Sequence, residues 1–129
     1  MLDNRKVFAA GSGLSTIAGL SREGQPGLVA VGLEMSYVRL LDADGKLLWS
    51  APTGAPVTDL VFTAGDSPML VVGTSSGMVL FFDDAGRQLG RFVAGDRVTV
   101  VAESNGGVLA AGADGMVRSL RVSRAINDR

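Results

Sequence analysis

Short apolar runs alternate with clusters of turn-forming residues along almost the whole chain. LVAVG (28–32) and MLVVG (69–73) are two such runs, and each is followed within a few residues by Gly, Ser or Glu. Val, Leu and Phe favour strands, whereas Gly, Asp, Ser and Pro mark turns. No segment keeps a 3.6-residue apolar period long enough to predict a helix of more than about one turn. The pattern therefore predicts an all-β protein.

The strand-and-turn pattern repeats with a period of about 40 residues. Gly32 and Gly73 are separated by 73 − 32 = 41 positions, and Asp42 and Asp83 by 83 − 42 = 41. The spacing from Gly73 to Gly112 is 112 − 73 = 39. A period near 40 with several strands in each repeat is typical of the blades of a β-propeller.

Each repeat is expected to form one blade of four antiparallel strands, named a to d from the central axis outward. The blades are predicted over 14–51, 55–93 and 96–122. Strands b and c are apolar on both faces, as expected for a sheet that is covered on both sides. Strand d is more polar, which suits an exposed edge. The third copy has no strand d, and residues 123–129 are predicted to be a polar tail.

Residues 4–10 are predicted to be a strand d that precedes the first blade. The segment NRKVFAAG (4–11) aligns with GRFVAG (90–95), which precedes the third strand a. Since propellers hold about four to eight blades, we expect two chains to form a six-bladed ring in which 4–10 completes the partner's third blade. The residues expected at this homodimer interface are Arg5, Val7, Phe8, Ala9, Met116, Val117, Leu120 and Val122.

The segment LLDADGKLLW (40–49) resembles the repeat of pyrroloquinoline-quinone-type, or quinoprotein-like, β-propellers. In that family strand c ends in Leu-Asp, followed by a turn with Gly-Lys and then Leu-Trp. The second copy, FFDDAGRQLG (81–90), keeps the Asp, the Gly and a basic residue but has no Trp. The WD-repeat family is resembled less, because Leu41 or Phe82 stands where its Trp would be. None of the quinone or calcium ligands of the first family can be matched here, so the resemblance implies a propeller fold and no particular activity.

Composition excludes several classes of chemistry. The chain of 129 residues has no Cys and no His, which rules out a thiolate nucleophile, a disulfide, a Cys/His zinc site and the usual neutral-pH general base. The 12 basic and 13 acidic residues nearly cancel and form no basic patch, so nucleic-acid binding is not expected. No apolar stretch is long enough to span a membrane and no signal peptide is recognisable, so a cytoplasmic protein is expected.

The acidic residues of two turns could be calcium ligands or could build the turns. Asp42 and Asp44 lie in DADG, and Asp83 and Asp84 lie at the matching place of the next repeat. A calcium loop needs more oxygen ligands than two carboxylates supply. We therefore expect hairpin turns, with no metal and no cofactor.

Four further residues are candidates for the central channel or for a surface that faces a partner. Trp49 either packs between blades or anchors a partner. Asp59 lies inside a predicted strand a and should be near the channel, as a solvated residue or as part of a ring of two subunits. Arg39 and Arg118 occupy equivalent places in two copies of strand c, with half-buried stems and exposed heads.

These features favour a non-enzymatic scaffold that binds a protein partner and assembles by exchange of its N-terminal strand. One alternative is a propeller that uses a central pocket for catalysis or for a cofactor. Another alternative is a piece of a longer propeller, whose small-ligand or quinone-cofactor site lies in sequence outside this chain. Bound chromophore or metal would indicate the first alternative, and the flanking coding sequence would identify the second.

Overall fold

The computed structural model describes residues 13–65, 67–105 and 107–122. Within these ranges every regular element is a strand, so the prediction of an all-β fold is confirmed. None of the described residues belongs to a helix that could cross a membrane. The strands are β1 (Leu14–Arg22), β2 (Gln25–Leu33), β3 (Tyr37–Asp42), β4 (Leu47–Pro52), β5 (Val57–Phe62), β6 (Leu70–Thr74), β7 (Met78–Phe82), β8 (Gln88–Val93), β9 (Val98–Ser104), β10 (Gly107–Gly112) and β11 (Val117–Leu120).

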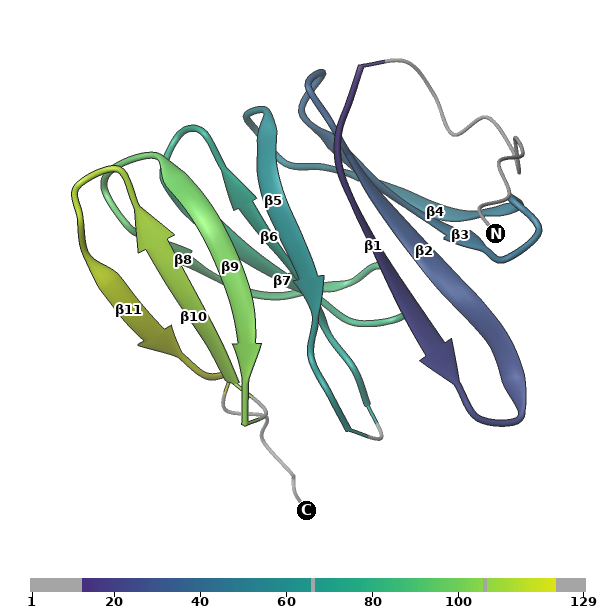
Figure 1. Ribbon diagram of the computed structural model, residues 1–129. Helices are drawn as coiled ribbons and strands as arrows, with labels where there is room; N and C mark the ends of the chain where they lie inside the picture. Colours follow the sequence, from purple (N-terminus) through teal and green to yellow (C-terminus); the bar gives the residue numbers. More distant parts are fainter. Residues whose placement is uncertain (1–12, 66, 106, 123–129) are drawn as a thin grey trace, which may run out of the picture.

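The strands form three antiparallel sheets that stand side by side (Figure 1). The first sheet contains β1 to β4, the second β5 to β8 and the third β9 to β11, each paired in chain order. The first strands of the sheets, β1, β5 and β9, are neighbours on the side where the sheets converge (Figure 1). Successive antiparallel meanders whose innermost strands lie side by side in this way are the arrangement of propeller blades.

Two apolar clusters fill the spaces between the sheets. The first lies between the first and second sheets, and the second lies between the second and third. Because side chains alternate across a strand, Leu70 and Val72 on β6 enter the first cluster, whereas Met69, just before β6, and Val71 enter the second. The second sheet is therefore buried on both faces, which explains why its middle strands are apolar throughout.

The third repeat is shifted by one residue relative to the expectation from its glycines. Leu60 pairs with Val72, and its counterpart Val101 pairs with Ala110, which is 110 − 72 = 38 positions after Val72. By this register Gly112 is the counterpart of Thr74, so the alignment of Gly73 with Gly112 is wrong by one position. The difference matters because a shift of one residue moves every side chain of a strand to the other face.

Candidate functional site

Asp42 and Asp83 build two turns of the same geometry. In each case Oδ1 accepts hydrogen bonds from the backbone N–H groups two and four residues later, all at 2.9 Å. Gly45 and Gly86 follow with φ of 89° and 88°, a conformation that glycine adopts without a Cβ clash. Within the described ranges, no group of three or more His, Cys, Asp and Glu residues could hold a metal ion.

The pKa of Asp83 is lower than that of an ordinary aspartate. Burial acts to raise this pKa, but hydrogen bonds from the backbone and side chain of Arg87 and from the backbone of Ala85 outweigh it. The guanidinium Nε lies 2.9 Å from Asp83 Oδ2. The carboxylate is therefore charged at neutral pH, and its oxygens are engaged in the turn.

The side chain of Trp49 on β4 extends from the first sheet to the second. Its Nε1 donates a hydrogen bond to the carbonyl oxygen of Asp84 at 3.1 Å, and its ring lies 5.6 Å from that of Phe82 between centroids. The indole also covers Gly86, where an added Cβ would come within 2.9 Å of the ring. The structure thus places Trp49 in the junction between two sheets.

Asp59 connects the innermost strands of all three sheets. Its Oδ2 accepts the backbone N–H of Val101 on β9 at 2.9 Å, and its Oδ1 accepts the hydroxyl of Thr16 on β1 at 3.5 Å. Asp59 itself lies on β5, between these two strands. Both carboxylate oxygens therefore bind protein groups along the side where the sheets converge.

Arg39 and Arg118 occupy the same ladder position in two sheets, and Leu80 holds that position in the sheet between them. Arg39 pairs with Val31, Leu80 with Val72 and Arg118 with Ala110. Arg118 also forms an ion pair with Asp114 at 3.2 Å, whereas Arg39 is half-buried on β3. The two arginines lie in different sheets and do not form one cluster.

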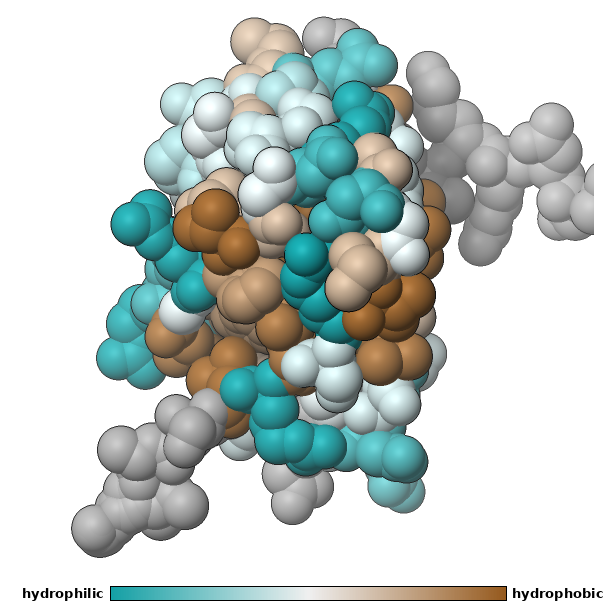
Figure 2. All heavy atoms as spheres, turned by 90° about the vertical axis from the view of Figure 1, so that its left-hand side faces the viewer, coloured by the Kyte–Doolittle hydropathy of each residue, from teal (hydrophilic) through white to brown (hydrophobic). Residues whose placement is uncertain are grey.

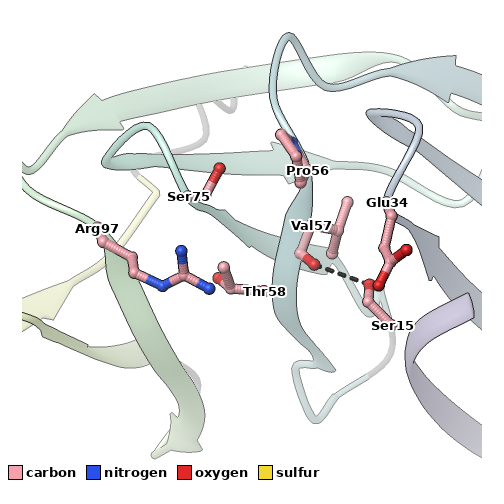
Figure 3. A pocket seen from close by; sticks show the side chains of 7 residues that line it. All are labelled: Ser15, Glu34, Pro56, Val57, Thr58, Ser75 and Arg97. Carbon is pink, nitrogen blue, oxygen red and sulfur yellow. Dashed lines mark hydrogen bonds between the residues drawn. The ribbon is translucent and has the colours of Figure 1, made fainter.

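A polar pocket of about 480 Å³ opens where the inner strands begin (Figure 3). In Figure 3 the guanidinium of Arg97 extends toward Thr58 on one side, and Glu34 lies beside Ser15 on the other. The Ser15 hydroxyl donates to the carbonyl oxygens of Val57 at 2.7 Å and Gly32 at 3.1 Å. The Ser15 proton is therefore directed at backbone carbonyls and not at a general base. Its walls are Ser15, Glu34, Pro56, Val57, Thr58, Ser75 and Arg97.

Sequence reasoning singled out none of the pocket residues. Part of the signal was nevertheless present, because Pro56 and Arg97 recur at an interval of 97 − 56 = 41, immediately before the inner strands β5 and β9. Ser15 is not a third copy of this place, because Leu14 pairs with Leu33 as Val57 pairs with Thr74, which makes Thr58 the counterpart of Ser15. The repeats bring the pocket residues together at one end of the sheets.

The outer face of the third sheet is apolar and exposed. Val101, Val108 and Ala110 point toward the second sheet, so their neighbours along each strand point outward. Two outward cross-strand rows result. Brown side chains gather on this face in Figure 2, which views the molecule from the side of the third sheet. The rows are Val100, Ala111 and Val117, and Ala102, Leu109 and Ser119.

β11 forms the edge of this sheet, and among the described residues β10 is its one paired neighbour. Met116 and Val117 are 54% and 65% exposed at the beginning of this edge. Leu120 and Val122, by contrast, pack against the cluster between the second and third sheets. The other predicted interface residues, Arg5, Val7, Phe8 and Ala9, lie outside the described residues.

Comparison with known proteins identifies the fold. No protein-family model matches the sequence, and no curated protein matches it. A crystal structure of BBS1N in complex with ARL6DN, soaked with lead, matches with a TM-score of 0.70 and 9% sequence identity. The match covers 84% of this chain and 37% of that chain, so the present sequence spans well under half of the matched protein's length.

A likeness at this level of identity concerns the fold alone. The matched part of BBS1N is a β-propeller domain, whereas the match does not distinguish a quinoprotein-like repeat from a WD-like one. The more specific resemblances therefore stay predictions. The three converging meanders and this likeness together show that the chain is an all-β protein with a β-propeller fold.

Proposed function

We propose that the chain is a non-enzymatic β-propeller scaffold that assembles with a second copy of itself and binds a protein partner through the assembled ring. The observation that supports this proposal is the outer side of the third sheet. There an apolar face, with Val117 65% and Val100 50% exposed, lies beside the edge of β11, which pairs with no other described strand than β10. The corresponding faces of the first two sheets are covered by the next sheet.

A second copy is the occupant that fits this side best. Residues 4–10 align with the outer strand of the second repeat, so the same segment of another chain offers an outer strand for β11. Three sheets from each of two chains give six, which lies within the range of about four to eight blades in closed propellers. Pairing would satisfy ladder hydrogen bonds worth about 0.5–1.5 kcal/mol each, and covering the apolar face would add to them.

The role in protein binding is supported by the fold. The matched BBS1N propeller was crystallised in complex with ARL6DN. For this chain, a rigid ring with loops at both faces offers an equivalent platform. The purified protein is expected to contain no stoichiometric metal and no chromophore, which elemental analysis after dialysis and an absorption spectrum would check.

Mass measurement in solution by light scattering tests the assembly. The full chain is expected to be a dimer, and the chain without residues 1–10 a monomer or an aggregate. Val117→Glu should also dissociate the dimer, because it places a charge on the outer face. Val93→Glu is the matched control, since Val93 is 64% exposed on β8 of the second sheet, which does not meet the partner in the proposed ring, and it should leave the mass unchanged.

Two results would contradict the proposal. If the truncated chain remains a dimer with unchanged melting, residues 4–10 do not close the third sheet. If the full chain stays monomeric at all concentrations, the chain does not form a ring with itself. That result would favour the interpretation of the chain as one part of a longer propeller.

A further inference from the structure

The junction between the first and second sheets differs from the junction between the second and third sheets at one position of the outer strand. In the first sheet Trp49 on β4 pairs with Leu40, and in the second Gly90 on β8 pairs with Phe81. Leu40 and Phe81 are 81 − 40 = 41 positions apart, and Trp49 and Gly90 are 90 − 49 = 41 positions apart. Gly90 therefore stands where the first junction has its indole ring.

The place of the missing ring is open. A Cβ added to Gly90 would meet no atom of the described residues within 4 Å. A groove of about 310 Å³ lies at this position between the second and third sheets, and we call it the Gly90 groove. Its walls are Phe81, Leu89, Gly90, Arg91, Phe92, Leu120, Arg121 and Val122.

The groove keeps the counterparts of the groups that hold Trp49 in the first junction. Trp49 stacks on Phe82 and donates its N–H to the carbonyl of Asp84. With the offset of 38 positions that pairing establishes for the third sheet, the counterpart of Phe82 is Leu120 and that of Asp84 is Val122. Both counterparts line the groove, so residues at the places of Phe82 and Asp84 are kept while the indole is absent.

We propose that the Gly90 groove binds a tryptophan side chain of a partner protein, presented on an acidic segment. An indole matches the apolar walls and carries the one N–H donor that the first junction uses. The walls formed by the described residues include two arginines, Arg91 and Arg121, and no acidic residue, which favours carboxylates on either side of the tryptophan. The chain's own single tryptophan is Trp49, which is already engaged, so a second copy is not the source of the ring.

This site does not depend on the proposed ring, because all its walls belong to the second and third sheets of one chain. The probe is a pentapeptide with one tryptophan flanked by two acidic residues on each side, titrated into the isotope-labelled full chain and followed by NMR. We expect saturable shifts of the amides of Gly90, Phe92 and Leu120. The same peptide with alanine in place of tryptophan should bind at least about tenfold more weakly, and one with lysines as flanks should also bind more weakly.

Gly90→Trp is the decisive variant. It should fill the groove from within, raise the melting temperature and weaken peptide binding at least about tenfold. Met35→Trp, which adds an indole on an exposed turn, is the matched control and should leave binding unchanged. Trp49→Gly opens the corresponding place in the first junction and should add a second site to the titration.

Three results would overturn the proposal. The first is the absence of shifts at peptide concentrations up to a few millimolar, and the second is equal binding of the tryptophan and alanine peptides. The third is undiminished binding to folded Gly90→Trp. None of them depends on whether the chain is a dimer, so failure of the ring and failure of this site are distinguishable.

Discussion

The aspartates at the beginning of the two outer turns each accept two backbone N–H groups through Oδ1. Asp83 also binds the Arg87 guanidinium through Oδ2, whereas the side chain of the adjacent Asp84 forms no such bond. Replacing Asp83 with alanine should lower the free energy of unfolding by about 1–2 kcal/mol, because two backbone hydrogen bonds and one exposed ion pair are lost. Chemical denaturation at pH 7 measures this, and Asp84→Ala should change the same free energy by less than about 0.5 kcal/mol.

The contribution of Asp83 should also depend on pH. Its pKa is lower in the folded chain than in an ordinary aspartate. The stabilisation is then complete above the unfolded pKa of about 3.9 and is lost as the pH falls through the folded pKa. The difference between the wild type and Asp83→Ala should therefore shrink below about pH 4. An equal difference in unfolding free energy at pH 7 and pH 3 would contradict this assignment.

Asp59 offers a sharper substitution, because one of its two bonds can be kept. Asp59→Ala removes the acceptor of the Val101 N–H and should cost about 1–3 kcal/mol of unfolding free energy, since a partly buried donor loses its partner. Asp59→Asn keeps one carbonyl oxygen for Val101 and can donate to the Thr16 hydroxyl, so its loss should be smaller. Similar losses for both variants, measured by denaturation, would show that the carboxylate charge matters more than the acceptor.

At the scale of strands and sheets, close approach of neighbouring sheets depends on particular glycines. A Cβ at Gly73 would lie 2.6 Å from Cγ1 of Val98, whereas a Cβ at Gly90 would be free. Gly73→Ala should therefore destabilise the chain by about 1–3 kcal/mol through overpacking. Gly90→Ala should be neutral or stabilising by up to about 1 kcal/mol. Thermal denaturation of the pair checks both, and equal effects would show that the inner strands adjust to the extra methyl group.

Much of the arrangement of strands and sheets could be predicted from the sequence. Apolar b and c strands and Asp-Gly turns indicate a sheet that is covered on both faces, and the period of about 40 indicates blades. The register of the third sheet could not be predicted, because Gly112 occupies the place of Thr74 and local composition does not show the offset. The polar pocket was missed for a related reason. Ser15, Pro56 and Arg97 have no common chemistry, and the packing of the inner strands of three sheets side by side is what brings them together.

The sequence predicted the structural roles of some candidate residues better than those of others. The turn role of Asp42 and Asp83 follows from local chemistry, and the structure shows their carboxylates bonded within the turns. The place of Trp49 between sheets was one of two alternatives, and its contact with Gly86 depends on a strand 35 or more residues away. The bonds of Asp59 to two other sheets involve a backbone N–H, which carries no signal in the sequence.

For the whole molecule, assembly should make stability depend on protein concentration. If the outer face of the third sheet is covered by a second copy, the melting temperature should rise between about 2 µM and about 200 µM by mass action. Val117→Glu should remove this dependence and lower the melting temperature at high concentration, since it prevents association. A wild-type melting temperature that is constant over this range would show that folding and association are not linked.

The different junctions also bear on the fidelity of folding. Chains made of similar repeats risk docking the wrong pair of units, because any two share most of their surface. Here the first junction has an indole over Gly86 with Ala51 two residues further along, and the second has Gly90 with Phe92 two residues further along. An exchange of neighbours would change which of these side chains fill each junction. The order of the repeats along the chain therefore contributes to the fit between sheets, and a chain with its repeats permuted should be less stable although its composition is unchanged.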